Sequence, residues 1–397
     1  MGELVTIEEA LALVLGHVVV LPAETVPLAA AAGRILAEPG RAATDLPPFP
    51  SSAMDGFAIR SADTPGSLEI VGRIAAGRPA AGAIGAGEAM GIATGGVVPD
   101  GADSVVPIED VVEGANSIRV GSAVPVGGNV RPRGGDIEAG QEVVPAGKAL
   151  RAPQIAALAA AGAAELSCHR RPTVTVLATG TELRRPGDPL RAGEIYESNG
   201  LMVEVALTAA GAVVDRPESV PDDEGAHLAA LASGLSSDVL VTSGGVSVGP
   251  HDLVRRLESE LGVTEIFWGV AMRPGKPLSF GVRGSTLVFG LPGNPVSSLV
   301  GCELFVLPAI RALQGATAPE PRFERGILGQ ALRRAPARDD LVRARIDLSA
   351  DGVILWPVVG QESHMIARTA IADALIHVPR DEGELAAGTP ARYLRLA

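Results

Sequence analysis

The stretch "SDVLVTSGGVSVGPHDLVRRLESELG" (237–262) passes from an apolar run through a glycine-rich loop into an amphipathic segment. The apolar run predicts a buried strand, and the amphipathic segment predicts a helix with one apolar face. That face is made of Leu253, Val254, Leu257 and Leu261. Gly244 and Gly249 have the spacing of a phosphate-binding P-loop, but Pro250 and His251 stand where that loop needs Lys and Ser or Thr. The stretch therefore predicts a strand, a loop and a helix, with a ligand loop that has no P-loop lysine.

The same alternation of strand and helix extends over residues 171–317. The predicted strands include "TVTVLATG" (173–180), "SDVLVTSGG" (237–245) and "STLVFGLPG" (285–293). The predicted helices are "ESNGLMVEVALTAAGA" (197–212), "DDEGAHLAALASG" (222–234), "DLVRRLESELG" (252–262) and "NPVSSLVGCELFVLP" (294–308), the last bent or ended at Pro308. This order predicts an α/β domain with a parallel-type sheet covered by helices on both faces.

The rest of the chain divides into three further parts, which makes the fold class multidomain α/β plus β. Residues 1–40 have a helical pattern and, with 135–170, form a predicted split N-terminal domain that includes a helix at "APQIAALAAAGAAEL" (152–166). Residues 41–134 are rich in short apolar runs and turn signals, which predicts an inserted β-rich, barrel-like domain. Residues 318–397 read as a small C-terminal β-domain, with two strands joined around Asp351 and Gly352.

Composition excludes several classes of protein. The net charge of −13 and the pI near 5.0 argue against general nucleic-acid binding, so an anion site has to be local. Two cysteines without C-x-x-C spacing and six scattered histidines indicate neither a disulfide framework nor a zinc site. The N-terminus has no secretory signal pattern, and no apolar run reaches about 18 residues. We therefore expect a soluble, cytoplasmic protein that binds neither nucleic acid nor a membrane.

Three glycine-rich loops follow predicted strands, at "ATGTEL" (178–183), "TSGGVSVG" (242–249) and "GLPGNPVSS" (290–298). In open parallel sheets, ligands bind outside the carboxyl ends of the strands, and these loops offer backbone N–H groups near helix N-termini. For the third loop, ordinary helix capping by Asn294 and Pro295 is the alternative. Three such loops at one edge favour a ligand pocket. Its predicted binding residues are Gly244, Gly245, Ser247, Gly249, Pro292, Gly293, Asn294 and Pro295.

Three acids stand close to these loops, Glu182, Asp222 and Asp252. Together they can hold Mg²⁺ through oxygen ligands and water. A metal that neutralises phosphates would explain why the loop lacks the P-loop lysine. For Asp222 and Asp252, a favourable interaction with a helix N-terminus is the alternative.

Lysine is unusually rare in this chain. Of the 33 basic residues only Lys148 and Lys276 are lysine, and Lys276 lies in "MRPGKPLSF" (272–280). Chance is one explanation. The other is that Lys276 must be a compact point charge that the planar fork of an arginine does not reproduce.

Seven motifs in order carry a family resemblance. They are "SSAMDGFAIR" (51–60), "ATGGVVPDGADSVVPIED" (93–110), "RPRGGDI" (131–137), "TGTEL" (179–183), "TSGGVSVGPHD" (242–252), "MRPGKP" (272–277) and "GLPGNPVSS" (290–298). This chain resembles the molybdopterin molybdenumtransferases, the family of MoeA and the gephyrin E-domain. The resemblance implies an elongated subunit of four subdomains and a homodimer whose active site is shared between subunits. Other proteins of molybdenum-cofactor synthesis are further possible partners.

The implied activity is molybdate insertion into adenylylated molybdopterin with release of AMP, assisted by Mg²⁺. The family's functional acids fall on Asp55, Glu182, Asp222 and Asp252, and its threonine falls on Thr94. Its two functional prolines fall on Pro292 and Pro295. The molybdate-binding positions fall on Arg273, Lys276, Arg343 and Ser363, a set of cationic and neutral donors suited to an oxyanion.

Some alternatives remain at this point. Family members often carry a basic residue where this chain has Gly269, which is compatible with altered anion specificity, a partner protein or an inactive paralogue. Outside the resemblance, Arg343 can be a solvated strand charge, "ESH" (362–364) a turn, and Asp55 a turn residue before Gly56. A molybdopterin adenylyltransferase on the same α/β core and a non-catalytic scaffold are the competing functions.

Overall fold

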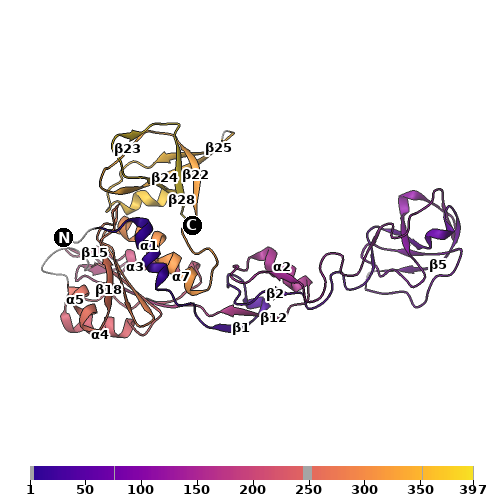
Figure 1. The fold of residues 1–397 in the computed structure, drawn as a ribbon, viewed down its shortest axis with the longest axis horizontal. Coiled ribbons are helices and arrows are strands. Elements are labelled where there is room, and N and C mark those ends of the chain that lie inside the picture. Colours follow the sequence, from indigo (N-terminus) through magenta and orange to yellow (C-terminus); the bar gives the residue numbers. More distant parts are fainter. Residues whose placement is uncertain (1–3, 76, 245–252, 351, 397) are drawn as a thin grey trace.

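The computed structural model describes residues 4–75, 77–244, 253–350 and 352–396. The molecule is elongated: the α/β and C-terminal domains lie together at one end, and a β-rich domain lies at the far end beyond a narrow middle part (Figure 1). Both termini lie at the α/β end (Figure 1). The chain leaves that end and returns to it, because β1 (Ala23–Pro27) pairs antiparallel with β12 (Glu165–His169).

The α/β domain is built on a six-stranded sheet in the order β16–β13–β17–β21–β20–β18. The first four strands are parallel, namely β16 (Val213–Asp215), β13 (Thr173–Ala178), β17 (Val239–Ser243) and β21 (Thr286–Leu291). The last two, β20 (Ser279–Arg283) and β18 (Thr264–Trp268), are antiparallel. The predicted parallel sheet is thus confirmed in its centre and corrected at one edge. The sequence pattern missed this edge because the two strands follow one another without a crossover helix.

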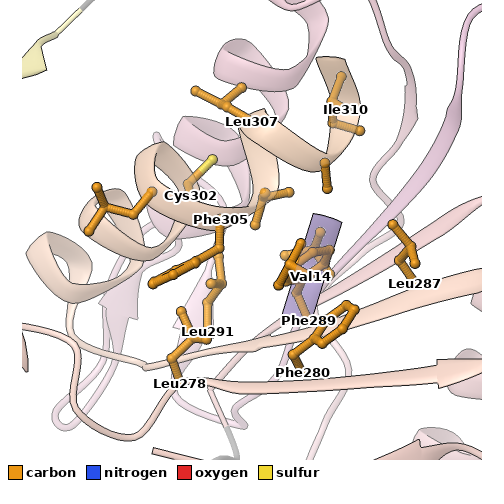
Figure 2. Packing of buried hydrophobic residues seen from close by; sticks show 14 of the residues in the cluster. Val14, Leu278, Phe280, Leu287, Phe289, Leu291, Cys302, Phe305, Leu307 and Ile310 are labelled. Carbon is orange, nitrogen blue, oxygen red and sulfur yellow. The ribbon is translucent and has the colours of Figure 1, made fainter. Parts of the chain in front are cut away.

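Helices cover both faces of this sheet, as the alternation in β17 requires. Val239 and Val241 point into one core with α1 (Ile7–Gly16), α3 (Asn199–Ala209), α6 (Pro295–Gly301) and α7 (Leu307–Leu313). Leu240 points into the other core with α4 (Glu224–Gly234) and α5 (Leu253–Glu260). Figure 2 shows the first core, where Val14 of α1 and Phe305 meet Phe280 and Phe289 of the sheet.

The helix predicted at 294–308 neither ends at Pro308 nor breaks there. It continues to Leu313 through a π-type segment, Cys302–Val306, in which the Leu307 N–H donates to the Cys302 carbonyl. Within the described residues, Pro295–Leu313 is the one helix long and apolar enough to cross a bilayer, but 83% of its apolar window is buried. Such burial is typical of a core helix.

Two other helical predictions were too long. Within residues 4–40, α1 is the one α-helix, because the β-branched run at Val18–Val20 and the prolines Pro22 and Pro27 disfavour a longer helix. Strand β1 and the short 3-10 turn Leu28–Ala30 follow it. The helix predicted at 152–166 ends early: α2 spans Ala152–Ala160, Gly162 takes φ +81°, and β12 begins at Glu165. Helix α1 also packs into the α/β core rather than remaining in a separate N-terminal unit.

The middle part and the β-rich domain are made of short strands. In the middle part, α2 packs beside β2 (Gly40–Arg41) and β11 (Glu142–Val144). The β-rich domain holds a six-stranded sheet made of β7 (Ser104–Pro107), β4 (Gly56–Ile59), β6 (Glu88–Ile92), β5 (Gly66–Ile74), β9 (Ser117–Val120) and β8 (Val111–Glu113), in that spatial order. Its entry is closed by β3 (Ser51–Ser52) on β10 (Val130–Arg131).

The C-terminal domain is a closed barrel, because β24 pairs with β25 on one side and β26 on the other. Its strands are β24 (Asp339–Ser349), β25 (Gly352–Pro357), β22 (Phe323–Leu328), β28 (Pro390–Arg395) and β26 (Ala374–Val378). Ser349 pairs with Gly352, which confirms the predicted two-strand unit at this place. Strand β19 (Met272–Arg273) leaves the α/β domain and pairs in parallel with β24, so it ties the two domains together.

Shorter elements complete the fold. Two-stranded pairs are β14 (Leu183–Arg184) with β15 (Ile195–Tyr196) and β23 (Leu332–Arg333) with β27 (Glu384–Leu385). The 3-10 helices are η1 (Leu28–Ala30), η2 (Ser61–Asp63), η3 (Ile108–Asp110) and η5 (Ile366–Ile371).

Candidate functional site

A cavity of about 640 Å³ lies where the loop after β19 meets the C-terminal barrel. Its lining includes Arg273, Lys276, Asn294, Ser297, Arg338 and Ser363. The loop after β19 reaches this place because Gly275 takes φ +108°, and a Cβ there would lie 2.6 Å from Cε of Met272. Three of the four predicted molybdate-binding residues therefore line one cavity, together with the predicted loop residue Asn294.

The cationic side chains of this cavity differ in how they are paired. Arg273 forms a two-pronged ion pair with buried Asp340, with its Nε donating to Oδ1 at 2.8 Å and its Nη2 donating to Oδ2. Within the part of the chain that the structure describes, neither Lys276 nor Arg338 has an ion pair or side-chain hydrogen bond. Glu362 is the other acid of the lining. The cavity thus holds two cations that no described acid pairs with directly, which favours an anionic ligand.

The glycine-rich loops after β13, β17 and β21 meet beside this cavity. A Cβ on Gly293 would lie 3.7 Å from Cα of Gly244, and a Cβ on Gly244 would lie 2.8 Å from the carbonyl of Thr179. Gly244 takes φ +100°, so both its backbone and its surroundings require glycine. Asn199 fixes the third loop by donating to the Gly293 carbonyl at 2.8 Å. The structure therefore brings the three predicted loops to one edge of the sheet.

Asn294 occupies the N-cap position of α6, but its side chain makes no capping hydrogen bond, and Pro295 takes the first turn. The third loop is held instead by Ser298, whose hydroxyl donates to the Pro292 carbonyl at 2.5 Å. Ordinary capping thus does not account for the Asn294 side chain, which lines the cavity.

Two of the three predicted metal-binding acids are described: Glu182 lies in the loop after β13, and Asp222 lies between β16 and α4. Thr181 donates to Oδ2 of Asp222 through its hydroxyl at 3.0 Å, and the Glu182 carboxylate folds back over Gly180. Both acids are exposed. The described residues contain no cluster of three or more His, Cys, Asp or Glu side chains that could hold a metal by themselves. Mg²⁺ usually uses one or two carboxylates together with water and substrate phosphates, and two exposed acids fit that requirement.

Several predicted residues cannot be placed. Gly245, Ser247, Gly249 and Asp252 lie outside the described residues.

The predicted pair Asp55 and Thr94 lies at the opposite end of the molecule. Thr94 donates to Oδ1 of Asp55 from its backbone N–H at 2.7 Å and from its hydroxyl at 3.1 Å. These two residues from separate motifs are thus in contact, but their β-rich domain lies far from the α/β domain of the same chain (Figure 1). Exposed apolar side chains stand on either side of Asp55: Met54 is 38% exposed, and Ile108, whose N–H donates to the Asp55 carbonyl, is 50% exposed.

Arg343 is placed differently from what the resemblance implies. Its side chain is fully buried on the outer face of β24, opposite to the face whose Ala344 belongs to the barrel core, and is not part of the cavity lining. Its guanidinium donates to the carbonyls of Gly360 and Met365, and burial lowers its pKa from the ordinary value. Arg338, five residues earlier, occupies the cavity instead. Sequence reasoning missed it because it lies just before β24, where no strand pattern places it.

Gly269 is also away from the cavity lining. It takes φ +91°, and a Cβ there would meet Cδ2 of Leu4 at 2.7 Å. The basic residue that is missing at this position therefore does not leave the cavity without charge, since Arg338 and Lys276 both line it.

Three family models match consecutive parts of the chain. They are the MoeA N-terminal region (domain I and II) over residues 5–162, the probable molybdopterin binding domain over 175–312, and the MoeA C-terminal region (domain IV) over 325–396. The chain belongs to the MoeA family. MoeA relatives include molybdopterin molybdenumtransferase 2 of Mycobacterium tuberculosis, 36% identical over 380 residues that cover 92% of this chain and 93% of the relative. The molybdopterin molybdenumtransferase of Haemophilus influenzae is 34% identical over 371 residues, 92% of each chain.

Solved MoeA structures have the same architecture. Two crystal structures of the molybdopterin biosynthesis MoeA protein from Pyrococcus horikoshii match with TM-scores of 0.83 and 0.85 at 30% and 26% identity. Each covers 99% of this chain, and 99% and 100% of the solved chains are covered in turn. The MoeA fold therefore extends over the whole molecule, including the β-rich domain that carries Asp55.

Proposed function

We propose that this protein is a cytoplasmic molybdopterin molybdenumtransferase. In the proposed reaction, molybdenum from molybdate passes to the dithiolene sulfurs of adenylylated molybdopterin, the phosphoanhydride is cleaved and AMP leaves. The observation that carries the proposal is a cavity in which Lys276 and Arg338 have no acidic partner among the described residues, directly beside three glycine-rich loops. Membership of the MoeA family, whose relatives bear this name, supports it.

The cavity suits a tetrahedral oxyanion. Lys276 supplies a compact charge, Arg338 supplies a planar set of N–H donors, and Ser363 adds a neutral hydroxyl. Arg273 contributes less net charge, because Asp340 already compensates it. Convergent donors of this kind hold an oxyanion in one orientation, which is the condition for transfer to a neighbouring acceptor.

The glycine-rich loops suit the phosphates of the adenylylated substrate. Gly244 and Gly293 lie close together at the ends of two parallel strands, where backbone N–H groups and the N-terminus of α6 favour negative charge. Glu182 and Asp222 would hold Mg²⁺ at this edge, with Asp252 as the third predicted acid. When bound, Mg²⁺ would neutralise charge on the phosphoanhydride oxygens.

The complete site is proposed to form in a homodimer. The pair Asp55–Thr94 lies far from the cavity of its own chain (Figure 1), so a second subunit must bring it there. The exposed apolar side chains of Met54 and Ile108 beside Asp55 are what such a contact would bury. A two-fold dimer lets each subunit present the same loop to the other's cavity.

A direct assay tests the activity. Purified protein that receives adenylylated molybdopterin, molybdate and Mg²⁺ should release AMP in proportion to the molybdenum incorporated. An adenylyltransferase would instead consume ATP on addition of molybdopterin, and a scaffold would do neither. Repeating the assay with tungstate identifies the preferred oxyanion.

A further inference from the structure

Arg343 is a buried cation with an unusual set of partners. Its two terminal nitrogens donate to the carbonyls of Met365 at 2.6 Å, Gly360 at 2.7 Å and Glu362 at 3.3 Å, and to the hydroxyl of Thr369 at 3.0 Å. Every one of these acceptors lies in the segment 360–369, and none is a carboxylate. A guanidinium inside a protein is normally paired with an acid, because removing its charge from water is unfavourable without one. This arginine is instead surrounded by the oxygens of one loop.

The backbone of Arg343 holds the same loop a second time. Its N–H donates to the Gln361 side-chain oxygen at 3.0 Å, and its carbonyl accepts from the Gln361 amide at 2.9 Å and from the Val358 N–H at 2.8 Å. The segment 358–369 is therefore wrapped around a single residue of β24. The hydrogen bonds fix the conformation of the loop, which has no sheet or α-helix of its own between Pro357 and η5.

The other side of this loop lines the anion cavity. Gln361, Glu362, Ser363 and His364 all belong to the lining. The Ser363 carbonyl also accepts from the Val296 N–H at 3.0 Å, in the first turn of α6 and directly after the Asn294–Pro295 pair. The loop is thus held by hydrogen bonds to Arg343 on its barrel side and by the hydrogen bond from Val296 of α6 on its α/β side. Ser363 lies where the two attachments meet.

We propose that Arg343 is a positioning residue of the anion site, which sets the place of Ser363 and His364 by holding the loop 360–365 against α6. The effect of Arg343 on catalysis rests on the proposed function. Its role in holding the loop in place is independent of that function. Removing the guanidinium leaves three carbonyls of the loop without their donor, and the loop has to move to find other partners. The donors on the C-terminal side of the cavity then lose their place relative to Lys276.

The variants Arg343→Met and Arg343→Lys test this, with Arg345→Met as the matched control. Arg345 lies two residues further along β24, is exposed and does not line the cavity. Hydrogen exchange on the ligand-free proteins should show faster exchange of the Val296 amide and of amides 360–366 in Arg343→Met, and no change in Arg345→Met. Arg343→Lys keeps a charge and three donors but loses the planar fork. The same amides should therefore exchange at rates between those of Arg343→Met and Arg345→Met.

The kinetic consequence separates positioning from a general loss of stability. In Arg343→Met the KM for molybdate should rise by up to about 100-fold, as a misplacement of roughly 1 Å can cause, while the KM for adenylylated molybdopterin stays unchanged. Arg343→Lys should recover part of the molybdate KM. Unchanged Val296 exchange in Arg343→Met, or equal increases in both KM values, would overturn the inference. If the wild type releases no AMP, the proposed function fails, and the exchange comparison with Arg345→Met still decides the positioning role.

Discussion

Lys276 faces the cavity with an ammonium group that no described side chain neutralises. Arginine at this position would keep the charge but replace a compact cation with a planar fork, next to an Arg273 fork already engaged with Asp340. We expect Lys276→Arg to keep the fold and to lower molybdate-dependent AMP release by roughly 10²–10³-fold, the usual effect of removing one well-placed electrostatic donor. Steady-state kinetics measures this.

The other lysine supplies the control. Lys148 is exposed in the middle part of the molecule, so Lys148→Arg should turn over at the wild-type rate. Equal activity of the two variants would mean that Lys276 is not a ligand of the anion.

Arg338 is the second cation of the cavity that pairs with no acid in the described part of the chain. We expect Arg338→Met to raise the KM for molybdate by about 10- to 100-fold, because a hydrogen bond to a charged group is worth roughly 1.5–3 kcal/mol. Arg333 in β23 is exposed and away from the cavity, and Arg333→Met should leave this KM unchanged. A molybdate titration that gives the same KM for both variants would remove Arg338 from the site.

The sequence motifs identified most of the residues that the structure brings together, but they did not show what each of these residues contacts. The contact between Asp55 and Thr94 joins two motifs 39 positions apart, and motif resemblance alone singled out both. For the two arginines of "ARDDLVR" (337–343), the sequence does not show which one lines the cavity. Whether Arg343 is buried under the segment 360–369 and whether Arg338 lines the cavity depend on how β24 pairs with β19 and β26, which is a long-range property.

Among the elements, the helix from Pro295 to Leu313 shows how a proline can be accommodated. Pro308 has no N–H, so a regular α-helix would leave one carbonyl of the preceding turn without a donor. The wider turn over Cys302–Val306 precedes it, and the Leu307 N–H bonds five residues back to Cys302. A π-type turn of this kind has no sequence signal that periodicity would reveal. The helix was therefore predicted to bend or end at Pro308.

Glu303 lies in this π-type segment, and its carboxyl makes the stability of the fold depend on pH. Burial raises the pKa of its carboxyl to about 7, partly offset by Arg311. Between about pH 4.5 and 7 the folded protein therefore binds a proton that the unfolded chain has lost. Stability falls as pH rises through this window and is level above it.

Glu303→Gln removes this titration. The variant should match the wild type near pH 4.5 and exceed its free energy of unfolding by on the order of 3 kcal/mol at pH 8. Urea unfolding at the two pH values measures the difference. The exposed Glu320 is the control, and Glu320→Gln should leave stability unchanged at both. A difference between Glu303→Gln and wild type that is the same at both pH values would show that Glu303 is not held protonated by the fold.

For the whole molecule, the sequence predicted four domains. The structure shows why these domains do not pack into one globule. The ribbon of β1 and β12 leads away from the α/β core, and the β-rich domain lies beyond α2 (Figure 1). Local patterns identify such domains but contain no information on the direction of a connecting ribbon. The elongated shape came from the family resemblance, as did the expectation that Asp55 serves another subunit.

That expectation is testable by complementation. Asp55→Asn and Glu182→Gln homodimers should each be inactive, because each lacks one residue in both sites. In a mixed dimer, the Asp55→Asn subunit supplies an intact Glu182 and its partner supplies an intact Asp55, so one of the two sites is complete. Refolding the two proteins together in equal amounts gives half mixed dimers, and activity should recover to about a quarter of the wild type.

A second mixture makes the result specific. Asp55→Asn refolded with Thr94→Val carries both changes in the β-rich domain, so every site of every dimer receives one altered residue. This mixture should stay inactive under the same refolding conditions, although its subunits exchange equally well. Recovery in both mixtures would show that refolding itself restores activity. Recovery in neither, with mixed dimers demonstrated by mass, would place Asp55 in its own domain as a structural turn residue and leave the cavity at the β19–β24 junction to act within one chain.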